Sequence, residues 1–206
     1  EDENPSARMT AALIEACEDL YMRQPGDDTT VLAVQIRKRK CCNLVFGPPK
    51  DPEDDDKMMG LFFSKEGRHI VCGGTTAKIT ARYLNKEIKT DVNYSDPSIP
   101  PTSSIDGVDL VTEGGITVAK VLDYARDYLE DNTLFEKWEK QKDGASQIAR
   151  LLFREATDIN IFFGKAQNAA HQGEASGIAF AIKEKIIEEL KQCLEKMGKT
   201  VIINYF

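Results

Sequence analysis

The sequence predicts an α/β fold, in which a layered, mostly parallel β-sheet carries helices on both faces. Along residues 41–206, short continuously apolar segments that stop at a glycine or a polar turn alternate with longer segments of helical spacing. Strands that are apolar on both faces are typical of a parallel sheet covered on each side by helices. A chain of 206 residues with 41% hydrophobic content can bury one good core with a small appendage.

The predicted strands of this region are apolar runs that end at a breaking residue. They span residues 41–46, 69–72, 108–111, 159–163 and 200–206. The predicted helices between them carry one apolar stripe beside polar positions. They span residues 51–66, 75–84, 117–129, 143–156 and 178–197, with Thr75 or Thr76 and Thr117 as expected N-caps and Gly198 as a C-terminal stop.

The first 38 residues are predicted to form a separate unit. Residues 6–23 have the spacing of an amphipathic helix, and residues 29–37 form an apolar strand pattern after a turn at Gly26 and Asp27. The basic run 37–40 follows directly. It is interpreted as a solvated linker, with an anionic contact site as the alternative, so the domain boundary is placed there and residues 41–206 form the second domain.

Composition excludes several classes of protein. A net charge of −7 argues against general nucleic-acid or anionic-membrane binding, and no apolar run approaches the length of a membrane span. The five cysteines are an odd number and contain no Cys-x-x-Cys pair. Their apolar neighbours are typical of reduced cysteines in a cytoplasmic protein.

The turn before the first predicted strand carries the sequence Asp27-Asp28-Thr29-Thr30, which runs directly into Val-Leu-Ala-Val. A carboxylate fixed at the mouth of a strand is a good ligand for Mg²⁺ or Mn²⁺. The segment resembles the last motif of the metal-dependent serine/threonine protein phosphatases of the stage II sporulation protein E family. The resemblance implies that Asp27 ligates a Mn or Mg pair, with Asp28 beside it. Residues 105–129 also resemble the region that follows the catalytic domain in some bacterial members.

The resemblance implies a parent enzyme that acts on a phosphoprotein. In the family, earlier metal-binding aspartates and an Asp-Gly-x-Gly turn precede this motif. Here only 26 residues precede Asp27, the chain begins with Glu1, and the Asp-Gly pairs at Asp106 and Asp143 lack the second glycine. We therefore expect residues 1–38 to be a remnant of the catalytic domain, residues 41–206 to be an accessory domain, and this fragment alone to be inactive, with no catalytic residue of its own. Its unpaired strand edge could support a homodimer.

Four predicted strands of the second domain end in turns that contain glycine, after Phe46, Cys72, Thr112 and Phe163. In a parallel sheet these turns share one edge, where open α/β folds bind ligands. A glycine turn that enters a helix exposes N–H groups able to hold an anion. The candidate ligand-binding residues are Gly73, Gly74, Thr75, Thr76, Glu113, Gly114 and Gly115.

This edge supports a second hypothesis, in which residues 41–206 form a non-enzymatic regulatory module for a small anionic ligand or a protein partner. Glu113 could accept a ribose hydroxyl, hold a metal or act as a base. The structural alternative is that these glycines serve positive φ angles or close packing, since the turns match neither dinucleotide nor P-loop fingerprints.

Three other candidates each have a structural alternative. The carboxylates of residues 51–56 could hold a metal, but acidic residues also favour a helix N-terminus. His171, near Asn168 and Gln172, could act as a general acid or base, or be a plain surface residue. Cys72 is placed like a nucleophile at the end of its strand, although a packed thiol is the simpler interpretation and an independent enzyme the last-ranked possibility.

Overall fold

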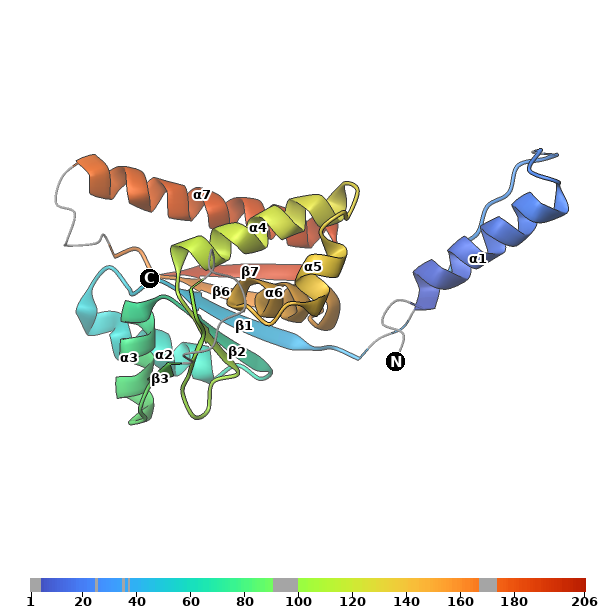
Figure 1. The fold of residues 1–206 in the computed structure, drawn as a ribbon. Coiled ribbons are helices and arrows are strands. Elements are labelled where there is room, and N and C mark those ends of the chain that lie inside the picture. The colour runs from blue at the N-terminus through green and yellow to red at the C-terminus, as the bar shows by residue number, and fades with distance from the viewer. Residues whose placement is uncertain (1–4, 25, 35, 37, 91–99, 167–173) are drawn as a thin grey trace. The chain divides into compact units, whose positions relative to one another are not determined.

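A computed structural model describes residues 5–24, 26–34, 36, 38–90, 100–166 and 174–206 (Figure 1). The chain divides into two compact units, residues 1–38 and residues 39–206. The division falls within the basic run 37–40.

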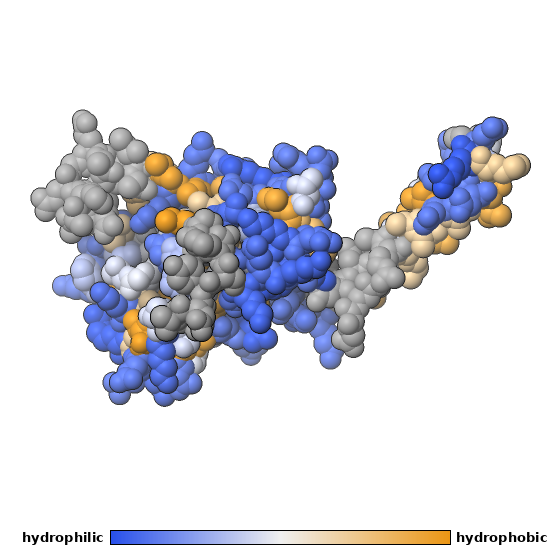
Figure 2. Space-filling view, in the orientation of Figure 1, coloured by the Kyte–Doolittle hydropathy of each residue, from blue (hydrophilic) through white to orange (hydrophobic). Residues whose placement is uncertain are grey.

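The described residues of the first unit contain one helix, α1 (Pro5–Leu20), followed by a turn. The strand predicted for residues 29–37 is wrong for the described part of that range, which carries neither helix nor strand. A strand exists only through hydrogen bonds to a neighbouring strand, and the described residues of this unit contain no such neighbour. The side chains of Leu32, Val34 and Ile36 are consequently between 80% and 96% exposed. Apolar residues also lie on the surface of this unit in Figure 2.

The second unit contains a seven-stranded sheet in the order β3-β4-β5-β2-β1-β6-β7. Five neighbouring strands, β5-β2-β1-β6-β7, are parallel, and β3-β4-β5 pair antiparallel at one side. The strand bounds are β1 (Cys41–Phe46), β2 (Arg68–Cys72), β3 (Lys89–Thr90), β4 (Ser103–Ser104), β5 (Leu110–Thr112), β6 (Asp158–Phe163) and β7 (Thr200–Tyr205). The sheet confirms the predicted fold class, a layered and mostly parallel α/β arrangement.

Helices cover both faces of this sheet (Figure 1). Helices α2 and α3 contribute to the core on one face, and α4, α5, α6, η2 and α7 contribute to the core on the other. Their bounds are η1 (Pro52–Asp54), α2 (Asp55–Phe63), α3 (Gly74–Leu84), α4 (Gly115–Leu129), α5 (Phe135–Lys140), α6 (Gly144–Ala149), the π-helical η2 (Arg150–Glu155) and α7 (Glu174–Lys196). In the described part of the chain no helix has the length and apolar character needed to cross a membrane.

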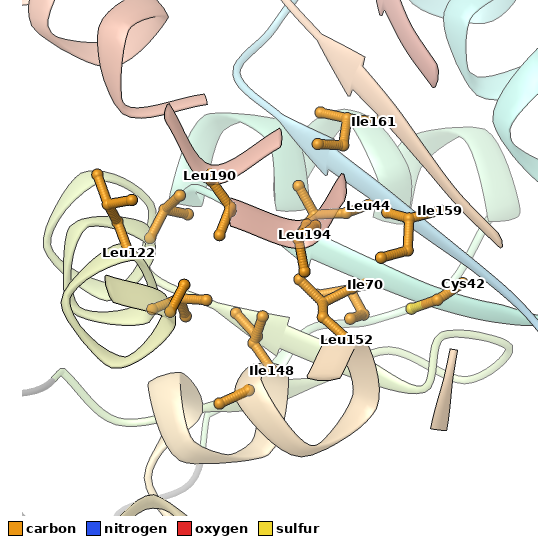
Figure 3. Packing of buried hydrophobic residues seen from close by; sticks show 14 of the residues in the cluster. Cys42, Leu44, Ile70, Leu122, Ile148, Leu152, Ile159, Ile161, Leu190 and Leu194 are labelled. Atoms are coloured by element: carbon orange, nitrogen blue, oxygen red, sulfur yellow. The ribbon is translucent and has the colours of Figure 1, made fainter. Parts of the chain in front are cut away.

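Alternation along the strands divides the core into two layers. In β1, Leu44 and Phe46 face the α4–α7 layer, whereas Val45 faces the α2–α3 layer. Figure 3 shows the larger layer, where Leu44 lies among residues from the sheet, α4, α6 and α7. Because the central strands are buried on both faces, polar groups can reach a ligand only at the ends of these strands.

Several local features differ from the sequence prediction. Helices α3 and α4 begin one turn earlier than expected, with Gly73 and Gly114 at the N-cap, so Thr76 and Thr117 lie inside the first turn. Helix α5 and the short strands β3 and β4 were not predicted. The expected stop at Gly198 is confirmed by its φ of 82° just beyond α7. The five cysteines are free.

Candidate ligand site at the carboxyl edge of the sheet

The four glycine-containing turns lie at one edge of the sheet, as parallel pairing requires. Phe46, at the end of β1, is in register with Cys72 of β2 and with Phe163 of β6, and Cys72 is in register with Thr112 of β5. The turns therefore form two neighbouring pairs. One pair follows β1 and β6, and the other follows β2 and β5.

In the pair of turns after β1 and β6, backbone atoms occupy the space beside the glycines. A Cβ atom added to Gly164 would lie 2.1 Å from the Pro48 carbonyl oxygen, and one added to Gly47 would lie 2.9 Å from the Gly164 carbonyl oxygen. The ladder continues past the strands, because the Gly164 N–H donates to the Phe46 carbonyl at 3.0 Å and the Ala166 N–H donates to the Pro48 carbonyl at 3.1 Å. The strand order reverses between β1 and β6, where open α/β sheets often bind ligands, but backbone occupies that position here.

The β2–β5 pair brings two helix N-termini together. The Gly73 N–H donates to the Thr112 carbonyl at 3.0 Å, and a Cβ atom on Gly114 would lie 3.2 Å from the Gly73 Cα. The same Cβ atom would lie 3.3 Å from the Phe46 ring. Gly73 has a φ of 115°, a conformation that L side chains rarely adopt. Glycine is therefore required at position 73 for its backbone conformation, and at position 114 for the close approach of the two turns.

The first helical residues of this pair face open space. A Cβ atom added to Gly74 or to Gly115 would meet nothing within 4 Å. Both residues occupy the first helical position, and neither N-cap supplies a side-chain hydrogen bond. The N–H groups of a first helical turn have no intrahelical partner, so this surface offers hydrogen-bond donors.

Two fully buried threonine hydroxyls lie in these same turns. Thr76 and Thr117 occupy the third position of α3 and α4, and both are 0% exposed. Within the described part of the chain, neither Oγ1 atom has a hydrogen-bond partner. The Oγ1 atom of Thr76 lies 3.2 Å from the place that a Gly73 Cβ would occupy, so it faces the N-cap turn. An unpartnered buried hydroxyl is uncommon and calls for an explanation.

Charged groups near these turns have opposite signs. The carboxylate of Glu113 belongs to an exposed residue in the β5–α4 turn. The Nζ atom of Lys183, from α7, lies 5.9 Å from the centroid of the Phe46 ring that borders Gly114. Among the described residues Lys183 forms no ion pair. The sequence did not single out Lys183, because its position depends on how α7 docks against the sheet.

Cys72 is a packed thiol rather than a nucleophile. Burial raises the pKa of the Cys72 thiol to about 12. Its Sγ atom accepts a hydrogen bond from the Thr112 hydroxyl at 3.4 Å, and that hydroxyl also lies 2.8 Å from the Glu113 carbonyl oxygen. A thiol with so high a pKa carries almost no thiolate near neutral pH. The interpretation of Cys72 as a small core residue therefore holds.

Asp27 lies in the first unit beside a hollow of about 370 Å³ that Glu18 and Tyr21 also line. Its Oδ1 atom accepts the Asp28 N–H at 2.8 Å. No group of three or more His, Cys, Asp or Glu side chains in the described residues could hold a metal ion. One carboxylate cannot hold a pair of metals, so the described residues do not by themselves fit the expected Mn or Mg pair.

The remaining candidates fall into structural roles or outside the described residues. The acidic run 51–56 spans η1 and the start of α2. Within this run, Asp55 forms an ion pair with Arg82, with 2.6 Å between Oδ2 and Nη2. This favours the helix-start interpretation of the acidic run. His171, Asn168 and Gln172 lie outside the described residues.

A larger hollow of about 610 Å³ lies at the opposite, amino edge of the sheet. The two arginines that line it each form an ion pair: Arg68 donates to Asp109 at 2.7 Å, and Arg39 lies 3.1 Å from Asp158. Burial alone would raise the pKa of Asp109, but hydrogen bonds from the His69 N–H and from Arg68 lower it below its ordinary value. Because both arginines of this hollow already have a carboxylate partner, the carboxyl edge is the stronger candidate for an anionic ligand.

Comparison with known proteins identifies no relative: no protein-family model, no curated protein and no solved structure matches the chain.

Proposed function

We propose that this chain is the carboxyl-terminal part of a Mn- or Mg-dependent serine/threonine protein phosphatase of the stage II sporulation protein E type, a cytoplasmic enzyme acting on a phosphoprotein. The observation that carries the proposal is the segment after Asp27. Its apolar side chains at positions 32, 34 and 36 are almost fully exposed. Such a segment is costly to expose in water and is expected to pair within a sheet, and the described residues of this unit contain no sheet. Asp27, which directly precedes that segment, would then be one metal ligand among several, the others supplied by the rest of the catalytic domain.

The test is hydrolysis of 4-nitrophenyl phosphate with added MnCl₂. Three proteins are compared: the 206-residue chain, a version extended upstream in its own gene, and the extended version carrying Asp27→Ala. We expect activity only in the extended version with Asp27 intact. Activity of the 206 residues alone that vanishes in Asp27→Ala would contradict the inactivity of the fragment. Silence in the 206-residue and extended proteins would remove the phosphatase proposal and leave Asp27 as an ordinary turn residue.

A second candidate function concerns residues 39–206, which we propose to be a regulatory module that binds a small anionic ligand. Contact between the glycine turns that open α3 and α4 supports it, because it brings two helix N-termini close together at the carboxyl edge of the sheet. The test is a thermal-shift panel of nucleotides and phosphorylated metabolites on the full chain. If no compound raises the melting temperature and Gly74→Val behaves like the parent protein, this candidate is wrong.

A further inference from the structure

We propose that the paired turns of α3 and α4 form a site for the phosphate group of a small phosphorylated molecule. The site consists of the N–H groups of residues 74–76 and 115–117, the hydroxyls of Thr76 and Thr117, and the ammonium group of Lys183. This proposal rests on the regulatory-module candidate and is independent of the phosphatase proposal, because binding is measured without catalysis.

The backbone supplies most of the donors. The first hydrogen bond of each helix ends at the N-cap glycine. The carbonyl groups of Gly73 and Gly114 accept the N–H groups of Ala77 and Val118 at 2.8 and 3.1 Å. The N–H groups of the next three residues in each helix are those that a helix leaves unpaired. Both helices are long enough to carry a dipole, with 11 residues in α3 and 15 in α4. Two such N-termini in contact attract negative charge more strongly than one alone.

The buried hydroxyls are the observation that distinguishes these turns from ordinary helix starts. Thr76 and Thr117 take the same position in their helices, both are fully buried, and neither Oγ1 has a partner among the described residues. Leaving a hydroxyl buried without a partner is unfavourable, so a ligand acceptor would remove that penalty. The Thr76 hydroxyl lies beside the Gly73 turn, and both hydroxyls are fully buried, so a phosphate oxygen reaches them only when the glycine turns shift. Glycine is the residue that least resists such a shift.

Phosphate fits this set of groups better than a carboxylate does. A phosphomonoester presents three acceptor oxygens and up to two negative charges, and so can engage both helix N-termini and a lysine together. The exposed Glu113 in the β5–α4 turn would repel further negative charge on the ligand. The remainder of the molecule should therefore be neutral, and hydroxyl groups on it could donate to Glu113.

The first experiment uses inorganic phosphate as the probe and the full 206-residue chain. Backbone amide shifts are followed by ¹H–¹⁵N NMR during titration with sodium phosphate, with sodium chloride added to keep the ionic strength constant. We expect saturable shifts with a Kd in the millimolar range at residues 74–76 and 115–117. Absence of shifts there, or shifts that chloride reproduces, would overturn the proposal.

Variants then separate ligand contact from structure. Thr76→Val and Thr117→Val keep the side-chain volume and remove only the hydroxyl. Each should raise the Kd for phosphate about tenfold, which corresponds to one hydrogen bond to a charged group. Their melting temperatures should be unchanged or higher, because the removed hydroxyls have no partner. An unchanged Kd in both valine variants would overturn the role of the hydroxyls.

The lysine is tested against a control on the same helix. Lys183→Gln and Lys185→Gln remove the same charge, but the Lys185 side chain is 77% exposed and pairs with Glu189 at 3.7 Å. We expect weaker phosphate binding in Lys183→Gln and an unchanged Kd in Lys185→Gln. Equal effects would show that net charge acts, and would remove Lys183 from the site. A panel compound that binds the chain without shifting the amides of residues 74–76 and 115–117 would reject this site while keeping the regulatory module.

Discussion

The two pairs of glycine turns at the carboxyl edge differ in what their glycines do. At the β1–β6 pair, Gly47 and Gly164 allow backbone to meet backbone, and carbonyl oxygens occupy the space that side chains would need. At the β2–β5 pair, Gly73 and Gly114 let two turns touch, while the residues after them, Gly74 and Gly115, face open space.

A glycine turn at a strand end therefore has no single structural role. The first pair closes the edge at the position where the strand order reverses, and the second pair leaves helix N-termini accessible beside it. A row of glycine turns in a sequence therefore overstates the size of a ligand site. The space around each Cβ position separates packing glycines from glycines that leave a surface open.

Gly164→Ala tests the β1–β6 pair of turns, and we expect it to destabilise the protein more than any other substitution considered. The new Cβ atom would lie 2.1 Å from the Pro48 carbonyl oxygen and 2.3 Å from that of Gly47, so backbone must move. We expect a loss of about 3 kcal/mol in the free energy of unfolding, measured by urea denaturation. Gly115→Ala is the control, since its Cβ meets nothing within 4 Å and alanine favours helix. Equal stability of the two variants would erase the distinction between the pairs.

Gly73→Ala tests whether the β2–β5 pair of turns depends on the backbone conformation of Gly73. A φ of 115° is strained for alanine and should lower the free energy of unfolding by about 2 kcal/mol. Gly198→Ala is a matched control, because Gly198 has a φ of 82° and lies beyond α7. Both variants should lose stability in thermal denaturation, but only Gly73→Ala should weaken phosphate binding. Weakened binding in both would point to a global effect.

The stability of the protein at alkaline pH tests whether its buried thiols are shielded from solvent. Burial raises the pKa of Cys72 and of Cys42 to about 12 in the folded protein, above their ordinary value of 9.0. Both groups favour the folded state fully below pH 9, and this stability is lost as pH rises from 9 toward 12, because only the unfolded thiols ionise there. We expect the free energy of unfolding to fall above pH 9 by about 1 kcal/mol per thiol per pH unit.

The measurement is urea denaturation between pH 8 and pH 10.5, with Cys72→Ala as the comparison. The variant should show a smaller fall with pH than the parent protein, although its stability at pH 8 will be lower because a buried side chain has been shortened. An identical pH dependence in the two proteins would mean that folding does not raise the pKa of the Cys72 thiol. Cys72 would then be accessible to solvent in the folded protein.

The smallest effect compares two buried threonines of α3. Thr80 donates its hydroxyl to the Thr76 carbonyl at 2.9 Å, whereas the Thr76 hydroxyl has no partner among the described residues. We expect Thr80→Val to lose about 1 kcal/mol in urea denaturation, and Thr76→Val to be neutral or slightly stabilised. A comparable loss in Thr76→Val would reveal a partner for its hydroxyl in the folded protein and would weaken the proposed site.

The sequence predicted the parallel strands and the long helices because their burial determines their residue types. The run 41–46 is apolar except for Asn43, as is typical of a central strand, and the stripe of residues 117–129 marks α4. It missed β3 and β4, since two-residue strands leave almost no pattern. It also predicted a strand over residues 29–37, where local propensity is strong but strand formation needs a partner.

The candidate site was predicted in outline only. Parallel pairing places Gly73 and Gly114 on one edge, so their proximity followed from the topology. Sequence could not show that Gly47 and Gly164 fill their side of that edge, because a packing glycine and an open glycine look alike. The position of Lys183 depends on the docking of α7, which residue types alone do not determine.

The position of β1 has a consequence for folding. β1 lies in the centre of the parallel sheet, yet its partner β6 follows 117 residues later in the chain, as in the pairing of Cys41 with Asp158. A ribosome needs on the order of ten seconds to make that length of chain. During this interval β1 can pair with β2 but keeps its other edge open. We therefore expect closure of the β1–β6 ladder to be a late, rate-limiting event, and mispairing to be most probable before it occurs.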